Sequence, residues 1–226
     1  MNIQNDFEKI KTIFLLKDYD LLSIFPYGSR VYGTNSDKSD YDYIAVFKDG
    51  TVKDDFSLEK YVFKDQILST DNCTDKFISY NIHTYNYSTF VKLIEKHKIS
   101  ALECIFLPKE KLLCDRKKFN FTLNITTLRS SISEKASHSW VKAKKKFEVE
   151  KDKNIYIAKK SLFHSFRIID FGKQIAKNGQ IADYSSMNNL WFDILNNESE
   201  DWKDYFNLYK IKHNESLTEF REMAPK

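Results

Sequence analysis

The amino-acid sequence predicts a mixed α/β (α+β) fold over residues 1–115 and a helical domain over residues 116–226. Short apolar runs bounded by polar turns occur before Pro108, and longer helical periodicities dominate after it. The 226 residues include only 5 Gly and 3 Pro beside 18 Phe and 13 Tyr. This composition indicates a folded chain with a sizeable core and few flexible linkers.

The first half is expected to open with a helix, capped by Asn5 or Asp6, and to close with a helix that ends before Pro108. Apolar runs rich in Ile, Val, Phe and Tyr predict the strands between them, and Ser88 is a candidate helix cap. The expected elements are a helix over residues 7–16, strands over 21–25 and 41–47, a short helix or loop over 30–33, a turn-rich connection over 48–59, strands over 61–68 and 77–85, and helices over 88–95 and 100–106.

In the second half, apolar residues recur at helical spacing and predict helices over residues 128–146, 155–177, 187–195 and 208–223. Asn178-Gly179 is a suitable end for the second of these, because glycine readily takes the left-handed conformation of a helix C-cap. His97, His138 and His213 fall in patterns typical of ordinary surface or helical residues.

The formal net charge of +4 is mild, but lysines gather where the first two of these helices meet. A phosphate-rich partner would suit that density of positive charge. Interleaved acids, among them Glu148 and Asp152, equally favour a solvated helix face, and both interpretations stay open. The lysines are Lys142, Lys144, Lys145, Lys146, Lys151, Lys153, Lys159 and Lys160.

Three cysteines, Cys73, Cys104 and Cys114, form no Cys-x-x-Cys pair, so the sequence suggests neither a disulfide framework nor a zinc site. A reducing cytoplasm fits this pattern best. Residues 1–17 alternate charged and apolar side chains and lack the pattern of a signal peptide. No apolar run approaches the length of a membrane span, so we expect no membrane partner.

The most informative segment has a Gly28-Ser29 turn after an apolar run, then ten residues, then Asp40-x-Asp42 at the head of a second apolar run. Glycine lets the backbone approach a phosphate closely, and the serine hydroxyl and nearby N–H groups can donate to phosphate oxygens. Residues two apart on a strand point to one face, so both carboxylates can share Mg²⁺ or Mn²⁺ held against a triphosphate.

This segment resembles the active-site motif of the DNA polymerase β superfamily of nucleotidyltransferases. The resemblance implies a polymerase-β-type mixed sheet with flanking helices. It also implies that Asp40 and Asp42 bind the catalytic metal, and that Gly28 and Ser29 hold the phosphates of a nucleoside triphosphate. Arg30 is placed to reach phosphate as well, although a pairing with Asp37 is an alternative.

The superfamily usually has a third carboxylate on a neighbouring strand, which here corresponds to residues 77–85. Ser79, Asn81 and His83 share one face of that strand, and none of them is acidic. Asn81 can ligate a metal through its carbonyl, although without negative charge. Glu103, set in an apolar segment, and Asp75 are the substitutes that we consider, with Glu103 as a candidate catalytic residue.

The segment 159–169 with the later Asn178-Gly179, together with residues 85–106 and 220–225, is similar to the RNA repair pathway polymerase-β branch of the superfamily. Lys160, His164 and Arg167 lie on one face of the predicted helix. The resemblance implies that this face contacts nucleotide or acceptor. The alternative is a buried His164 and an Arg167 paired with Asp170.

These features predict a Mg²⁺-dependent nucleotidyltransferase that uses a nucleoside triphosphate and acts on an RNA end, for example that of a tRNA, in RNA repair. Protein nucleotidylylation, as in small antitoxin-like members, is the first alternative, and transfer to a small molecule is another. A catalytically silent member that binds RNA or a partner is the alternative from a different class, because the third acid is missing. The sequence leaves the oligomeric state open.

Overall fold

The computed structural model describes residues 3–53, 56–63, 77–149, 151 and 153–226. The chain forms two compact units. The first, here called the sheet unit, contains Met1–Glu95 and Ser100–Phe121, and the second, the helical unit, contains Lys96–Ile99 and Thr122–Lys226. Whether the chain divides into independently folding domains after residue 115 stays a prediction.

The sheet unit contains a five-stranded mixed sheet with the strand order β3-β4-β2-β1-β5. β2 is its centre, since it pairs antiparallel with β1 and parallel with β4. The mixed sheet with flanking helices, followed by a helical region, confirms the predicted α/β (α+β) fold class. The strands are β1 Leu21–Tyr27, β2 Tyr41–Phe47, β3 Phe56–Phe63, β4 Phe77–Asn86 and β5 Cys114–Asp115.

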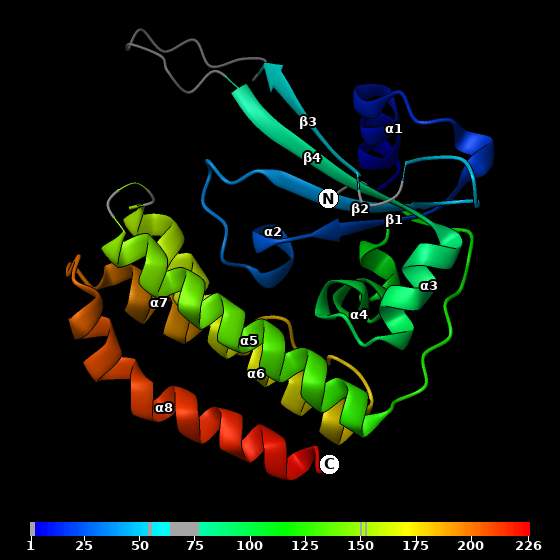
Figure 1. Ribbon diagram of the computed structural model, residues 1–226. Helices are drawn as coiled ribbons and strands as arrows, with labels where there is room; N and C mark the ends of the chain where they lie inside the picture. The colour runs from blue at the N-terminus through cyan, green and yellow to red at the C-terminus, as the bar shows by residue number, and fades with distance from the viewer. Residues whose placement is uncertain (1–2, 54–55, 64–76, 150, 152) are drawn as a thin grey trace, which may run out of the picture. The chain divides into compact units, whose positions relative to one another are not determined.

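Helices cover both faces of this sheet (Figure 1). On one face, Ile10 and Phe14 of α1 pack in a core with Tyr43 and Phe47 of β2. On the other face, Phe90 of α3 stacks on a phenylalanine of β1, with ring centroids 5.8 Å apart. The helices are α1 Ile3–Phe14, α2 Ser29–Tyr32, α3 Tyr87–Glu95 and α4 Ile99–Ile105, with 3₁₀ turns at Asp18–Asp20 and Lys109–Lys111.

Three expectations for this half were wrong. α1 spans Ile3–Phe14, so Asn5 and Asp6 lie inside the helix and do not cap it. Residues 56–59 belong to β3 and not to a turn-rich connection, because they pair antiparallel with β4. Ser88 lies inside α3 and does not cap it. Its backbone N–H donates instead to the Asp49 carboxylate at 2.8 Å. The segment 64–76, with the rest of the expected third strand and Asp75, lies outside the described residues.

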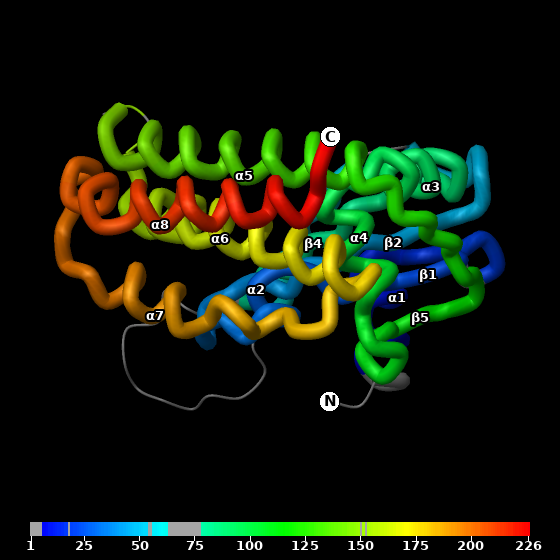
Figure 2. Tube along the Cα trace, turned by 90° about the horizontal axis from the view of Figure 1, so that it is seen from below, coloured from blue at the N-terminus to red at the C-terminus, as the bar shows by residue number. Residues whose placement is uncertain are grey.

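In the helical unit, α5, α6 and α8 lie side by side (Figures 1 and 2). Asn124 and Asn154 cap α5 and α6, each accepting a backbone N–H at 2.9 Å from the third residue beyond it. Gly179 ends α6 with a φ of 73°, as the sequence predicts. The helices are α5 Ile125–Glu148, α6 Ile155–Asn178, α7 Asn188–Asn196 and α8 Trp202–Met223.

Tryptophan and phenylalanine side chains dominate the core of the helical unit. Trp140, Trp191 and Trp202, which are all of the tryptophans in the chain, belong to this one core. α8 begins at Trp202 and not near residue 208, because Asp201 caps it by accepting the N–H of Lys203 at 2.9 Å. Among the described residues, none of the helices combines the length and apolar character needed to cross a bilayer.

Two histidines that we expected to be ordinary are buried in the helical unit. His97 accepts the backbone N–H of Asn124 through Nε2 at 2.9 Å, next to the start of α5. His213 of α8 is 4% exposed and lies 4.4 Å from the Trp140 ring. Their burial follows from the elements that pack on them, which a single helical pattern does not reveal.

Candidate functional site

The turn after β1 brings the backbone directly against an acidic side chain. Gly28 has a φ of 79°, a conformation that side-chain-bearing residues rarely adopt. A Cβ atom at this position would lie 2.5 Å from Oδ2 of Asp42. The carbonyl of Gly28 accepts the N–H of Val31 at 3.0 Å, which starts α2 with a buried Ser29 at its head. The structure therefore brings Gly28, Ser29 and Asp42 together.

A row of polar residues crosses the sheet at the level of this turn. Asp42 of β2 is in register with Asn81 of β4, which is in register with Glu59 of β3. Residues in register share a face of the sheet. Asn81 donates to Oδ1 of Asp42 at 3.0 Å, and Ser79 donates to Oε1 of Glu59 at 2.9 Å. We call Asp42, Asn81 and Glu59, with the bridging Ser79, the polar row.

Asp40 immediately precedes β2 and adds a second carboxylate near the polar row. The charge of Asp40 affects Tyr61 of β3. A hydrogen bond to Glu59 raises the pKa of this tyrosine, and the negative charges of Glu59 and Asp40 raise it further. Tyr61 is in register with Ser79, so its side chain lies on the same face as the polar row. Asp42 and Glu59 thus face one side of the sheet, and the charge of Asp40 acts on Tyr61 of the same side.

Glu59 is the acid that sequence reasoning missed. We looked for a third carboxylate on residues 77–85, where the position next to Asp42 is Asn81. Glu59 is supplied by the strand beyond. The alternation of Phe56 and Leu58 with Ser57 and Glu59 is a strand signal that could have shown it.

Glu103 lies in α4 and is 2% exposed. Its Oε2 accepts a hydrogen bond from the hydroxyl of Tyr32 at 2.5 Å. Tyr32 is the last residue of α2 and is equally buried. This contact ties α2, and with it the Gly28-Ser29 turn, to α4. Glu103 therefore contributes to the position of the turn. Its catalytic role stays a prediction.

Arg30 links the helix after the turn to the backbone just before Asp42. Its guanidinium donates to the carbonyl oxygens of Ser39 at 2.6 Å and Asp40 at 3.2 Å. It also lies over the Tyr41 ring, 3.8 Å from the centroid. These contacts hold the backbone of Asp40 beside α2.

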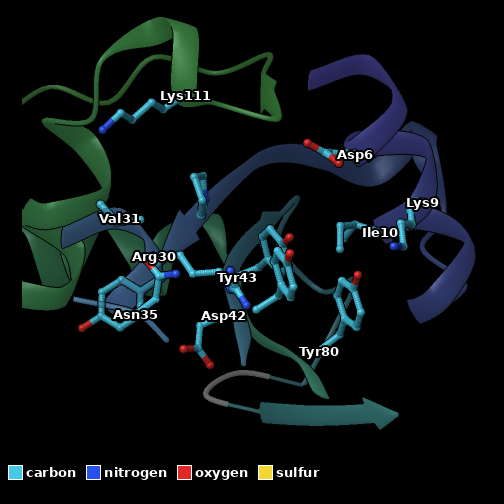
Figure 3. A pocket seen from close by; sticks show the side chains of 13 residues that line it. Asp6, Lys9, Ile10, Arg30, Val31, Asn35, Asp42, Tyr43, Tyr80 and Lys111 are labelled. Atoms are coloured by element: carbon cyan, nitrogen blue, oxygen red, sulfur yellow. The ribbon is translucent and has the colours of Figure 1, made fainter. Parts of the chain in front are cut away.

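A pocket of about 450 Å³ lies beside the turn on the α1 side of the sheet (Figure 3). In its wall, the rings of Tyr41 and Tyr80 stack with their centroids 4.9 Å apart. Arg30 lies over the Tyr41 ring, and Lys9 lies over the Tyr80 ring. Burial raises the pKa of Tyr43, and the negative charges of Tyr80, Asp6 and Tyr41 raise it further, while Arg30 lowers it. The lining residues are Asp6, Lys9, Ile10, Pro26, Tyr27, Arg30, Val31, Asn35, Tyr41, Asp42, Tyr43, Tyr80 and Lys111.

The pocket and the polar row use opposite faces of β2. Tyr41 and Tyr43 alternate with Asp42 along the strand, so they point the other way. Figure 3 shows the Asp42 carboxylate turned away from α1. Asp42 is the second residue of β2 and, although it belongs to the polar row, it also lines the pocket.

The donor set around the turn fits a hard divalent cation. Asp40 and Asp42 provide carboxylate oxygens, which Mg²⁺ and Mn²⁺ prefer. Oδ2 of Asp42 lies directly against Gly28, in the space that a Cβ atom would need. Asn81 turns its amino group to Asp42, and its carbonyl accepts from Ser79 at 3.5 Å. No group of three His, Cys, Asp or Glu side chains suited to a metal occurs in the part of the chain that the structure describes.

Lys160, His164 and Arg167 belong to α6 of the helical unit. Arg167 is 5% exposed and donates through Nε to Nδ1 of His164 at 3.2 Å. Desolvation lowers the pKa of His164, and the positive charges of Arg167 and Lys160 lower it further. A neutral imidazole is the form that can accept this hydrogen bond. Asp170, the alternative partner of Arg167, accepts from Gln174 at 2.8 Å and Ser186 at 2.6 Å.

Two lysines of α5 complete a cationic group around His164. Lys142 and Lys135 also lower the pKa of His164 by their positive charge. We call Lys135, Lys142, Lys160 and Arg167 the cation group. Such a concentration of positive charge attracts phosphate-bearing ligands.

Other members of the lysine cluster have structural partners. Lys159 donates to the carbonyl oxygens of Leu195 at 3.0 Å and Asn197 at 2.6 Å, at the end of α7. Lys144 pairs with Glu148 at 3.7 Å on the exposed surface of α5. Lys144 therefore fits the solvated helix face, and Lys159 has a structural partner. A phosphate-rich partner for the cluster stays a prediction.

No protein-family model and no curated protein sequence matches the chain. Among solved structures, the chain is similar to a nucleotidyltransferase-like protein from Exiguobacterium sibiricum. The two share 11% sequence identity with a TM-score of 0.34, over 99% of this chain and 74% of the other. Two chains that superpose this weakly need not share a fold or a function.

Proposed function

We propose that the protein is a metal-dependent nucleotidyltransferase, which transfers a nucleoside monophosphate from a nucleoside triphosphate to a hydroxyl group. The observation that carries this proposal is the contact between the glycine turn and the acid, where a Cβ atom on Gly28 would lie 2.5 Å from Oδ2 of Asp42. A turn able to hold phosphate and a carboxylate able to hold Mg²⁺ meet at one point, as phosphoryl transfer requires.

In this proposal, Asp40 and Asp42 hold Mg²⁺ or Mn²⁺, with Asn81 as a neutral ligand or as the residue that orients Asp42. The metal would offset the charge of the triphosphate and of its leaving group. Gly28 and Ser29 hold the β- and γ-phosphates through backbone N–H groups and the hydroxyl. Arg30 keeps Asp40 beside the turn through its two carbonyl contacts.

For the acceptor we propose an RNA end, in keeping with the resemblance to the RNA repair branch. The cation group of the helical unit supports this choice, because a nucleic-acid backbone binds where lysine and arginine replace its counterions. Lys160, His164 and Arg167 would contact the nucleotide or the acceptor.

A catalytically silent member that binds nucleotide or RNA is the second candidate. One observation favours it: the position next to Asp42 on β4 is Asn81, which carries no charge. Without a third negative charge, a second metal would bind weakly. Glu59, one strand further along the polar row, is the described residue best placed to compensate.

The test compares the wild-type protein with Asp42→Asn, and with Asp115→Asn at the exposed edge strand β5 as the matched control. Each protein is incubated with α-labelled nucleoside triphosphates, Mg²⁺ or Mn²⁺, and total RNA or cell lysate. We expect Asp42→Asn to lose transfer by about 100-fold or more, because charge stabilisation of the transition state is lost. Asp115→Asn should be unchanged.

A second readout does not depend on turnover. Mn²⁺ with a nucleoside triphosphate should raise the melting temperature of the wild-type and Asp115→Asn proteins and leave that of Asp42→Asn unmoved. Binding without transfer in the wild-type protein would favour the silent member. An Asp42→Asn protein with normal turnover would contradict the proposed site.

A further inference from the structure

A serine and a histidine form a hydrogen-bonded pair on the outer strands of the sheet. Ser57 of β3 is in register with His83 of β4, and its Oγ lies 2.5 Å from Nδ1 of the imidazole. Ser57 is exposed to solvent, and His83 is half-buried. A hydroxyl held against an imidazole nitrogen is the arrangement in which a base can activate a serine nucleophile.

The pair lies on the same face of the sheet as the polar row. Ser57 and Glu59 are two apart on β3, and His83 and Asn81 are two apart on β4, so all four share that face. Ser57 lies two strands away from Asp42 across the sheet, and it is displaced by two residues along β3 from Glu59, which is in the same row as Asp42. With the usual strand spacing and rise, roughly 12 Å separates the two Cα atoms. A phosphate bound at Asp42 extends from one end of this distance and the Ser57 side chain from the other, so that the two can meet.

The strand order puts Ser57 on the side from which a nucleophile must arrive. Phosphoryl transfer needs the attacking and leaving oxygens roughly in line with the phosphorus. The Gly28-Ser29 turn follows β1, on one side of Asp42. β4 and β3, with His83 and Ser57, lie on its other side. A triphosphate with its β- and γ-phosphates at the turn would therefore direct its leaving group away from Ser57.

We propose that Ser57 is a site of self-nucleotidylylation, at which the protein accepts a nucleoside monophosphate on its own chain. Oγ of Ser57 attacks the α-phosphorus of a nucleoside triphosphate, and its proton passes to Nδ1 of His83, the atom against which the hydroxyl lies. The bond from the α-phosphorus to the oxygen that bridges to the β-phosphorus breaks, and pyrophosphate leaves. The product is a phosphodiester on Ser57. This inference rests on the proposed function, since it uses the same phosphate turn and acids.

The experiment incubates the full chain with ATP, GTP, CTP or UTP and Mn²⁺, without any added acceptor. Intact-mass measurement then looks for the addition of one nucleoside monophosphate, and peptide mapping locates it. We expect the adduct on the peptide that contains Ser57. Ser57→Ala should abolish it, while Ser57→Thr, which keeps a hydroxyl on the strand, should still accept the label. Ser88→Ala, on the exposed side of α3, is the matched control and should behave as wild type.

The histidine is tested by the rate at which the adduct forms. His83→Gln should leave the adduct on Ser57 but slow its formation by about 100-fold, the usual contribution of a positioned base. Asp42→Asn should prevent it. An adduct mapped to another residue would overturn the proposal. So would transfer to added RNA or protein with no adduct on the chain, although the proposed function would stand. Absence of both binding and transfer would remove both.

Discussion

Gly28 satisfies two independent requirements at once. Its φ of 79° suits glycine, and the space that a Cβ atom would need is taken by Asp42. Gly50 has nearly the same φ, 78°, but a Cβ atom there would meet nothing within 4 Å. The comparison separates backbone strain from the contact with the acid.

We predict that Gly28→Ala and Gly50→Ala each destabilise the protein by about 1–3 kcal/mol, the cost of an unfavourable backbone conformation. Only Gly28→Ala should also displace the Asp42 carboxylate. Thermal denaturation with and without Mn²⁺ and nucleoside triphosphate measures both effects. If Gly28→Ala kept the full ligand-induced stabilisation, the turn would not be part of the binding site.

His213 is a buried titratable group with an aromatic surrounding. It packs between Trp140, at 4.4 Å, and Phe166, at 5.2 Å between ring centroids. Among the described residues, neither of its ring nitrogens has a hydrogen-bond partner. Burial, and then the positive charge of Lys210, lower its pKa to about 4. The folded protein therefore holds the neutral form.

This pKa predicts a loss of stability on acidification. The unfolded chain binds a proton at His213 near pH 6.5, while the folded chain resists it down to about pH 4. The stabilisation is therefore complete above pH 6.5 and is lost as the pH falls towards 4, by an amount on the order of 3 kcal/mol. His213→Phe should flatten the dependence of the free energy of unfolding on pH in this range, as measured by urea unfolding. His138→Gln, at an exposed position of α5, should not. An unchanged slope in His213→Phe would contradict the assignment.

Single elements were predicted well where the sequence pattern alone determines them. The strand over residues 41–47 and the helix from residue 155 were predicted where β2 and α6 are found. β2 is a continuous apolar run from Tyr43 to Phe47 that follows Asp42. α6 has a cap at Asn154 and ends at Gly179. Local chemistry fixes both ends of such an element.

Pairing between elements could not be predicted in the same way. Glu59 joins the polar row, and Ser57 meets His83, because β3 pairs with β4 in one register. That register depends on contacts between strands distant in sequence, which local periodicity does not encode. The Gly28-Ser29 turn and Asp42, in contrast, were expected to act together because their segment resembles an active-site motif that contains both.

Close packing of helices α5, α6 and α8 depends on Gly172. A Cβ atom there would lie 2.8 Å from Ile132 of α5 and 2.9 Å from Phe220 of α8. Alanine normally favours a helix over glycine by about 1 kcal/mol. Overpacking a core costs about 1–3 kcal/mol, so we expect the steric term to win and Gly172→Ala to destabilise the protein.

Urea unfolding checks this, with Ile132→Ala as the partner variant. Adding Gly172→Ala to Ile132→Ala should cost less than adding it to the wild-type protein, because the space is then available. Strict additivity of the two changes would show that the methyl group does not meet Ile132.

At the scale of the whole chain, the proposed chemistry and the cation group belong to different compact units. The turn, both aspartates and the polar row lie in the sheet unit. The cation group lies on α5 and α6 of the helical unit. Binding measurements on variants of each unit therefore address separate parts of the proposed function.

The placement of the tryptophans gives the protein two distinguishable optical signals. Trp140, Trp191 and Trp202 lie in one core of the helical unit, so emission excited at the red edge of the absorption band reports that core alone. Tyrosines, which absorb at shorter wavelengths, occur in both units, with Tyr41, Tyr43 and Tyr80 in the sheet unit. Coincident transitions of the two signals indicate one cooperative unfolding event, and separate transitions indicate that the two units melt independently. The unmodified chain thus contains the tryptophan and tyrosine signals that distinguish these two outcomes.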